Sequence, residues 1–124
     1  MIGDHLMLKP EAAQNLGMVF HELGSNAVKH GSLSTPAGLV HIDWHVEDGA
    51  TPMLTLRWTE SGGPTVAAPT SRGFGTVIIE RLIPQSLRGE ARMSWDEDGF
   101  SWTLRAPMSS IARAGNYTTR SPLT

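Results

Sequence analysis

A single long helix is predicted over residues 10–30, and its pattern of apolar and polar residues constrains the fold more than any other feature. Apolar residues at helical spacing form one stripe, made of Leu16, Val19, Phe20, Leu23 and Ala27. Glu22, Asn26 and Lys29 form a second stripe along its flank. A carboxylate, a carboxamide and an ammonium group therefore lie beside a packed core. This order of groups suits a magnesium-nucleotide site, and a merely solvated helix face is the alternative.

Proline and glycine mark the two ends of this helix. Pro10 suits the first helical position because its missing N–H would have no partner there. Gly31 is well placed to end the helix. A short strand at residues 6–8 is predicted before the helix, and a turn-rich connection at residues 32–38 after it.

Alternating apolar and polar residues predict four further strands, each with one buried and one wet face. Residues 40–46 and 54–58 form one hairpin around a turn at residues 47–52. Residues 91–95 and 100–104 form a second hairpin around a turn at residues 96–99. Strands of this kind need a single covering layer, which helices can supply.

The segment between the two hairpins is predicted to hold a loop and a second helix. Residues 61–75 are rich in Gly, Pro, Ser and Thr without an apolar period, which is typical of a mobile loop. Residues 74–83 are predicted as a helix that ends at Pro84. Its inner side is expected to carry Phe74, Val77, Ile78 and Leu82.

The order of these elements predicts an α/β two-layer sandwich, in which helices cover one face of a mixed, mostly antiparallel sheet. We assign residues 1–108 to one domain, since a chain of 124 residues leaves little room for a second. Residues 109–124 are polar and aperiodic, and we interpret them as a disordered tail.

Composition excludes several classes of function. The formal net charge is −2 and the basic residues are scattered, so nucleic acid is not expected as a partner. The chain has no cysteine, which excludes disulfides, thiolate nucleophiles and thiolate zinc sites. No apolar run approaches the roughly 20 residues needed to span a bilayer. We therefore expect a cytoplasmic domain without membrane contact.

A second group of interest lies at the end of the strand at residues 54–58. The alternation that buries Leu56 and Trp58 places Glu60 on the same helix-covered face. Since an unpaired buried carboxylate is costly, Glu60 either lies at the rim in water or accepts hydrogen bonds from a specific group, such as the amino group of a base. Gly62 and Gly63 follow, and their missing side chains would let a flat ring approach the backbone.

A third group opens the predicted second helix and consists of Arg72, Gly73, Phe74, Gly75 and Thr76. Unobstructed N–H groups at a helix start bind phosphate, although a hinge and cap of an ordinary helix is the alternative. The pattern matches neither a Walker A loop nor a three-glycine dinucleotide fingerprint. Both of those nucleotide folds are therefore excluded.

Taken together, three motifs resemble the catalytic ATP-binding domain of sensor histidine kinases, in the GHKL superfamily that contains gyrase and mismatch-repair ATPases. They are His-Glu-Leu-x-x-Asn-Ala-x-Lys-His-Gly, Trp-x-Glu-x-Gly-Gly-Pro and Gly-Phe-Gly, in this order between residues 3 and 107. The HWE family is the most similar, because His21, Trp58 and Glu60 match the residues that mark it. The resemblance implies the Bergerat-type ATPase fold.

The resemblance also implies a role for each group. Asn26 would ligate Mg²⁺ with Glu22 near the metal. Lys29 would contact the phosphates, and His30 would lie near the phosphates or the sugar. Glu60, in place of the aspartate of ordinary histidine kinases, would accept from the adenine amino group. Gly62 and Gly63 would let the base pack closely. A lid would span residues 64–72, and the stretch from Arg72 to Thr76 would form its end next to the phosphates.

The expected partners follow from the same resemblance. Such a kinase transfers phosphate from ATP to a histidine on its own dimerisation helices, and then serves a response regulator through the full-length protein. The acceptor histidine is expected outside this chain. A serine kinase of the anti-sigma-factor type and a nucleotide-binding module without transfer are the alternatives.

The remaining histidines are given other roles. His21 lies about 140° round the helix from Asn26, so we interpret it as structural or as a contact to another domain. His41 and His45 share the wet face of one strand, where a solvated face is favoured over a surface metal site. His5 is not in the helical motif that the family uses for a phosphoacceptor.

Overall fold

A computed structural model describes residues 2–3, 5–64, 78–96 and 99–118 of the chain. Its elements, in chain order, are β1 (Ile2–Gly3), β2 (His5–Leu8), α1 (Pro10–Lys29), the short helix η1 (Ser32–Ser34), β3 (Leu39–Glu47), β4 (Met53–Ser61), the π-helical turn η2 (Ile78–Leu82), α3 (Ile83–Ser86), β5 (Glu90–Asp96), β6 (Gly99–Pro107), α4 (Met108–Ile111) and β7 (Ala112–Thr118).

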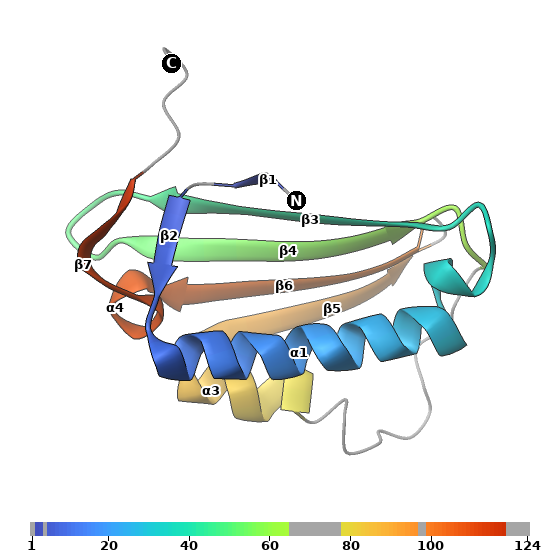
Figure 1. The fold of residues 1–124 in the computed structure, drawn as a ribbon, viewed down its shortest axis with the longest axis horizontal. Coiled ribbons are helices and arrows are strands. Elements are labelled where there is room, and N and C mark those ends of the chain that lie inside the picture. The colour runs from blue at the N-terminus through green and yellow to red at the C-terminus, as the bar shows by residue number, and fades with distance from the viewer. Residues whose placement is uncertain (1, 4, 65–77, 97–98, 119–124) are drawn as a thin grey trace, which may run out of the picture.

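The main sheet has five strands in the order β1-β3-β4-β6-β5 (Figure 1). Strand β1 runs parallel to β3, and every other neighbouring pair is antiparallel. Both predicted hairpins are confirmed, since β3 pairs with β4 and β5 pairs with β6. Pairing of β4 with β6 joins the two hairpins into one mixed sheet.

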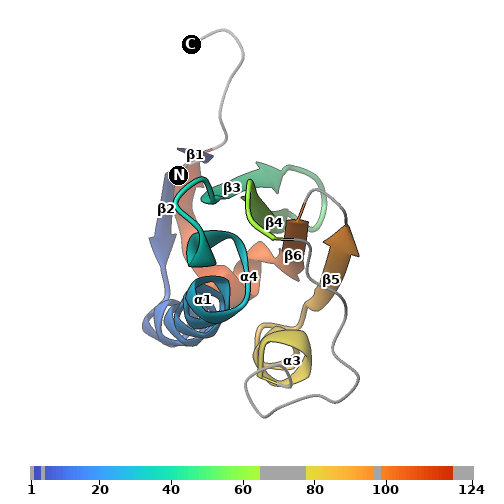
Figure 2. The ribbon, with the colours of Figure 1, turned by 90° about the vertical axis from the view of Figure 1, so that its right-hand side faces the viewer.

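Both α1 and α3 lie on the same face of this sheet (Figure 2), so the predicted two-layer α/β sandwich is confirmed. The core between the layers holds residues of α1, of the sheet and of the second helical segment, among them Val19, Leu23, Leu54, Leu56, Trp58, Ile79, Ile83, Trp102 and Leu104. Their side chains come from alternate positions of each strand, as the sequence pattern predicts.

Helix α1 confirms the first prediction closely. Its buried residues are Ala12, Leu16, Val19, Leu23 and Ala27. Phe20, at the edge of this stripe, stacks against Trp58 of β4 with ring centroids 6.2 Å apart. The apolar stripe thus attaches α1 along the sheet. No helix in the described part of the chain is long and apolar enough to cross a lipid bilayer.

The second helical segment differs from its prediction. It runs through η2 and α3 to Ser86, so Pro84 does not end it and lies instead in the first turn of α3, where a proline is tolerated. Leu82, expected inside, is 46% exposed, whereas Ile79 and Ile83 are buried. A π turn holds more residues than an α turn and so shifts the buried face. Phe74 and Val77 lie outside the described residues.

The interpretation of residues 109–124 as a disordered tail is wrong for residues 109–118. These residues form most of α4 and all of β7, which pairs antiparallel with β2 in a separate two-stranded sheet. Ile111 and Ala112 are buried, and Lys9 N donates to Ile111 O at 2.8 Å. Order here comes from contacts with the start of the chain, which local composition does not reveal. Residues 119–124 lie outside the described part.

Candidate functional site

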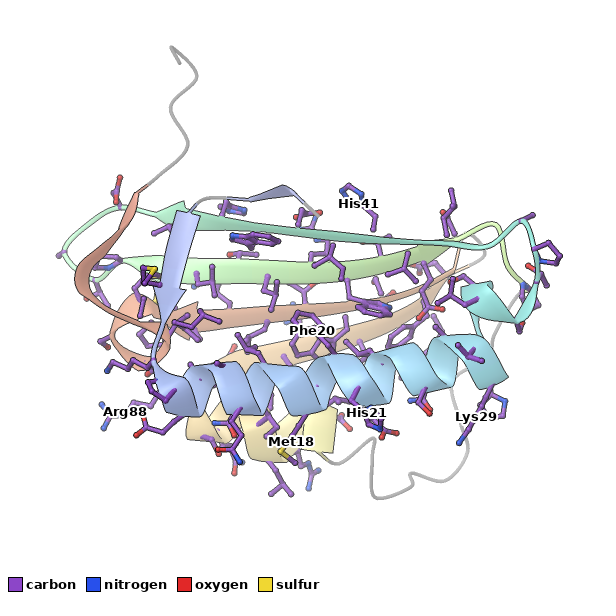
Figure 3. The ribbon with its side chains drawn as sticks, viewed as in Figure 1. Met18, Phe20, His21, Lys29, His41 and Arg88 are labelled. Atoms are coloured by element: carbon purple, nitrogen blue, oxygen red, sulfur yellow. The ribbon has the colours of Figure 1, made fainter. Side chains whose placement is uncertain are left out.

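The polar stripe of α1 lies along the C-terminal half of the helix, beside the buried Leu23 and Ala27. Glu22 and Asn26 are partly exposed, and Lys29 and His30 are exposed at the C-terminal end. Figure 3 shows Lys29 pointing away from the sheet, on the side of the helix opposite to the strands. The helix ends here, since the backbone N–H groups of His30 and Gly31 both donate to Asn26 O, at 2.8 and 3.1 Å.

Glu60 is buried at the end of β4, with 4% of its surface exposed. Its Oε1 accepts a hydrogen bond from the backbone N–H of Ser32 at 2.9 Å. Its Oε2 accepts one from the indole Nε1–H of Trp58, also at 2.9 Å. The prediction that Glu60 faces the helix layer is confirmed, and the alternative of a rim carboxylate in water is wrong. Burial is tolerable because two fixed donors face the two oxygens.

The geometry of the surrounding glycines explains how these donors reach Glu60. A Cβ on Gly31 would lie 2.2 Å from Glu60 Oε1, which is far inside contact distance. A Cβ on Gly63 would lie 2.3 Å from the Cα of Ser32. Gly62 has a φ of +74°, which favours glycine, and its Cβ would meet Ala37 O at 2.4 Å. These three glycines let the end of β4 pack directly against η1 and the residues that follow it.

Ser32 is a further polar residue at this junction. It is 3% exposed, and its hydroxyl has no hydrogen-bond partner among the described residues. Buried hydroxyl groups are normally satisfied, so this one has capacity for water or a ligand group. A buried carboxylate and a free hydroxyl form a donor and acceptor set that fits the polar edge of a base.

The structure thus brings together one part of the predicted site. Gly31, Glu60 and Gly63 meet around Ser32, directly after the last turn of α1, and Asn26 lies in that last turn. Another part is not tested, because Arg72, Gly73, Phe74, Gly75 and Thr76 lie outside the described residues, as does most of the predicted lid.

Sequence reasoning missed two partners of Glu60. The sequence pattern places Trp58 on the same face as Glu60 but does not predict that it donates to Glu60, although its spacing of two residues on a strand is a usable signal. Ser32 acts through its backbone N–H, which any residue except proline would supply, so its identity carries no such signal. Gly31 was predicted only as a helix end, and its contact with Glu60 depends on tertiary packing.

His21, His41 and His45 lie on exposed surfaces. His21 is exposed and points away from the sheet (Figure 3), so it is not part of the core between helix and sheet. A contact to another domain stays a prediction. His41 lies on the opposite, open face of the sheet, 3.5 Å from Asp43. Among the described residues no group of three or more His, Cys, Asp or Glu could hold a metal ion.

Comparison with known sequences identifies histidine kinases as relatives, although no family model matches the chain. A blue-light-activated histidine kinase of Brucella ovis is 33% identical over 110 residues, which cover 88% of this chain and 22% of the relative. Blue-light-activated histidine kinase 1 of Erythrobacter litoralis is 39% identical over 109 residues, or 86% of this chain and 29% of the relative. The chain spans less than a third of the length of these relatives.

Solved structures agree in fold. The histidine kinase domain of a blue-light-activated histidine kinase from Erythrobacter litoralis superposes with a TM-score of 0.64 at 20% identity, over 80% of this chain and 46% of that one. The catalytic domain of the histidine kinase ThkA gives a TM-score of 0.58 at 18% identity, over 86% of this chain and 75% of that one. The resemblance that the motifs predicted is confirmed.

Proposed function

We propose that this chain, which has the fold and the motifs of histidine kinase catalytic domains, binds Mg-ATP and supplies its γ-phosphoryl group for autophosphorylation of a histidine on a parent sensor kinase. The observation that carries the proposal is the buried carboxylate of Glu60 at the C-terminal end of α1. It meets two donors of the protein and keeps capacity for a third, as a pocket for an amino-substituted base requires.

The base end of the site is built around Glu60. Its carboxylate accepts from the adenine amino group, and the neighbouring Ser32 hydroxyl is available to a water or to the base edge. Gly62 and Gly63 permit close approach of the ring, in addition to the packing of protein segments that the structure assigns to them. The low solvent exposure of Glu60 favours discrimination between bases with and without an amino group. A base without that donor leaves the buried carboxylate with an unsatisfied acceptor that water does not reach.

The phosphate end follows the polar stripe of α1. The carboxamide oxygen of Asn26 is a ligand of the kind Mg²⁺ prefers, and Glu22 lies one turn earlier to orient the waters of the ion. Both Lys29 and His30 are exposed. Lys29 reaches the phosphates, and His30 lies near the phosphates or the sugar. The Arg72, Gly73, Phe74, Gly75 and Thr76 segment contributes backbone N–H groups on the lid side. Bound Mg²⁺ would neutralise charge on the transferring phosphoryl group.

The proposal assigns the nucleophile to another part of the parent kinase. The acceptor is a histidine of its dimerisation and phosphoacceptor domain, and a response regulator receives the phosphoryl group from there. Known relatives are several times longer than this chain, which supports a role as one domain of a larger kinase. We place that kinase domain in the cytoplasm.

Isothermal titration calorimetry with Mg-ATP tests the metal end. Asn26→Ala should abolish measurable binding, because it removes the proposed protein ligand of Mg²⁺. Asn15→Ala is the matched control, since Asn15 is a partly exposed asparagine of the same helix about three turns away. Full affinity in the Asn26 variant would contradict the metal-ligand assignment, and equal losses in both variants would point to damage of the helix.

Transfer is tested separately with γ-labelled ATP and a phosphoacceptor segment of a histidine kinase. Label on histidine supports the proposed reaction, whereas label on serine of a supplied protein would favour the anti-sigma-factor type of kinase. Binding without transfer to either acceptor would leave only the function of a nucleotide-binding module. Histidine and serine phosphates are told apart by acid treatment, which removes only the former.

A further inference from the structure

We infer that Trp58 is a positioning residue for nucleotide-base recognition: its indole N–H holds the Glu60 carboxylate in the orientation that accepts the 6-amino group of adenine. The Trp-x-Glu motif then acts as one recognition unit rather than as two separate residues. This inference rests on the proposed function, because it assumes that Glu60 faces the base.

The geometry of the unit comes from the strand. Trp58 and Glu60 are two residues apart on β4, so both side chains lie on the helix-covered face. Nε1 of Trp58 lies 2.9 Å from Oε2 of Glu60, and both side chains are at least 95% buried. A hydrogen bond to a carboxylate in such surroundings is among the stronger ones in proteins.

The two donors leave a defined set of lone pairs on the carboxylate. Each oxygen has two lone pairs, and Ser32 N and Trp58 Nε1 each occupy one. The remaining lone pairs lie in the carboxylate plane that these donors fix. They can accept from an exocyclic amino group, but they gain nothing from a purine that carries only hydrogen at C6.

A glutamate needs this restraint more than an aspartate does. Its side chain has one more rotatable bond, so it adopts more conformations and loses more entropy when a ligand orders it. A donor on the same strand removes that cost before the nucleotide arrives. The presence of Trp58 two residues before Glu60 therefore has a physical reason.

Trp58 is itself held rigidly. Its ring stacks on Phe20 of α1 at an interplanar angle of 26°, and across the sheet it is paired with Ile42 on one side and Trp102 on the other. Trp102 offers a matched control, because it is also buried and its indole N–H also makes one hydrogen bond, to Ile79 O at 2.9 Å. That bond goes to a backbone carbonyl and not to Glu60.

The test compares ATP with purine riboside triphosphate, which has hydrogen in place of the 6-amino group. By calorimetry, the wild-type chain should prefer ATP. Trp58→Phe should weaken ATP binding roughly tenfold and leave the analogue nearly unchanged, so the preference collapses. Trp102→Phe should keep the wild-type preference, even where it lowers thermal stability. Equal weakening of both ligands by Trp58→Phe, or an unchanged preference, would overturn the inference.

A second measurement needs no nucleotide, and it tests the Trp58–Glu60 hydrogen bond even if the Trp58→Phe variant does not fold. The indole N–H signal of Trp58 in an NMR spectrum should move on Glu60→Gln and stay in place on Glu47→Gln, a change at an exposed glutamate. An indole signal insensitive to Glu60→Gln would refute the bond. A wild-type chain that binds no nucleotide would instead refute the proposed function. Wild-type binding of both nucleotides with equal affinity would refute the adenine role of Glu60 and, with it, this inference.

Discussion

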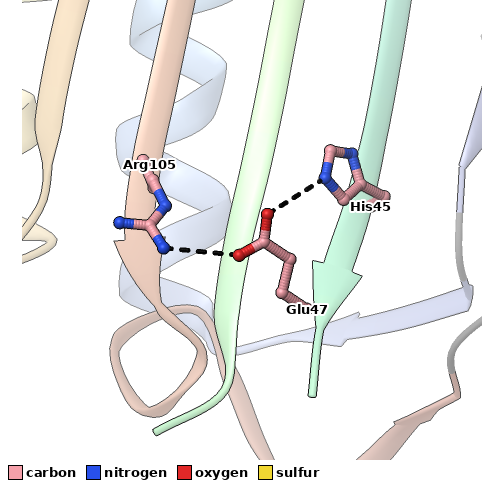
Figure 4. Close-up of polar contacts among 3 residues, drawn as sticks. All are labelled: His45, Glu47 and Arg105. Atoms are coloured by element: carbon pink, nitrogen blue, oxygen red, sulfur yellow. Dashed lines mark hydrogen bonds and ion pairs between the residues drawn. The ribbon is translucent and has the colours of Figure 1, made fainter. Parts of the chain in front are cut away.

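Glu60 and Glu47 lie near opposite ends of the same β3-β4 hairpin, on opposite faces of the sheet, and they show two ways of holding a carboxylate. Glu60 is 4% exposed and accepts from a backbone N–H and an indole N–H. Glu47 is 52% exposed in its side chain, with its oxygens 3.6 Å from His45 Nε2 and 3.3 Å from Arg105 Nη2 (Figure 4).

The difference between these sites is one of rigidity and solvent. The donors to Glu60 belong to the backbone and to a packed aromatic ring, so they cannot follow a displaced carboxylate. His45 and Arg105 are more than half exposed and can exchange Glu47 for water. Two glutamates of one hairpin should therefore differ greatly in what their removal costs.

The largest effect is expected from Glu60→Ala. The change leaves two buried N–H donors without an acceptor, together with a small cavity, and should lower the free energy of unfolding by about 3 kcal/mol. Urea unfolding followed by circular dichroism measures the loss. A cost below about 1 kcal/mol would mean that water replaces the carboxylate, and Glu60 would then resemble Glu47.

An intermediate effect is expected from Gly31→Ala, which leaves every hydrogen-bonding group in place. The new Cβ would lie 2.2 Å from Glu60 Oε1, so the carboxylate or η1 must shift, at a cost of about 2 kcal/mol. Gly17→Ala, inside α1, is the control, because nothing lies within 4 Å of its Cβ. There the better helix propensity of alanine should stabilise by about 0.5–1 kcal/mol. Opposite signs in chemical unfolding would locate the strain at Glu60.

The smallest effect is expected from Glu47→Gln. Exposed ion pairs contribute little and are screened by salt, so the free energy of unfolding should change by less than about 1 kcal/mol. Raising the salt concentration in the unfolding experiment should reduce even this difference between variant and wild type. A larger, salt-independent loss would show that the open face holds its charges as firmly as the covered face.

Local pattern was sufficient for most of the fold. The apolar stripe from Leu16 to Ala27 and the alternation in β4 each follow from the period of one element, and both are confirmed. The prediction failed where order depends on distant contacts. Residues 109–118 look featureless in sequence, yet β7 pairs with β2 about a hundred residues earlier. Pro84 does not end the second helical segment as predicted, because it lies in the first turn of α3, where a proline is tolerated.

Residue periodicity and motifs specify the elements, the faces they bury and the similarity of this chain to histidine kinase catalytic domains. The partners of Glu60 depend instead on how those elements pack in three dimensions. The N–H of Ser32 that binds Glu60 lies 28 residues away in sequence. Gly31 lets it approach, because a side chain at this position would collide with the Glu60 carboxylate. The physical reason is that periodicity encodes direction within one element, whereas a hydrogen-bond partner depends on how separate elements pack.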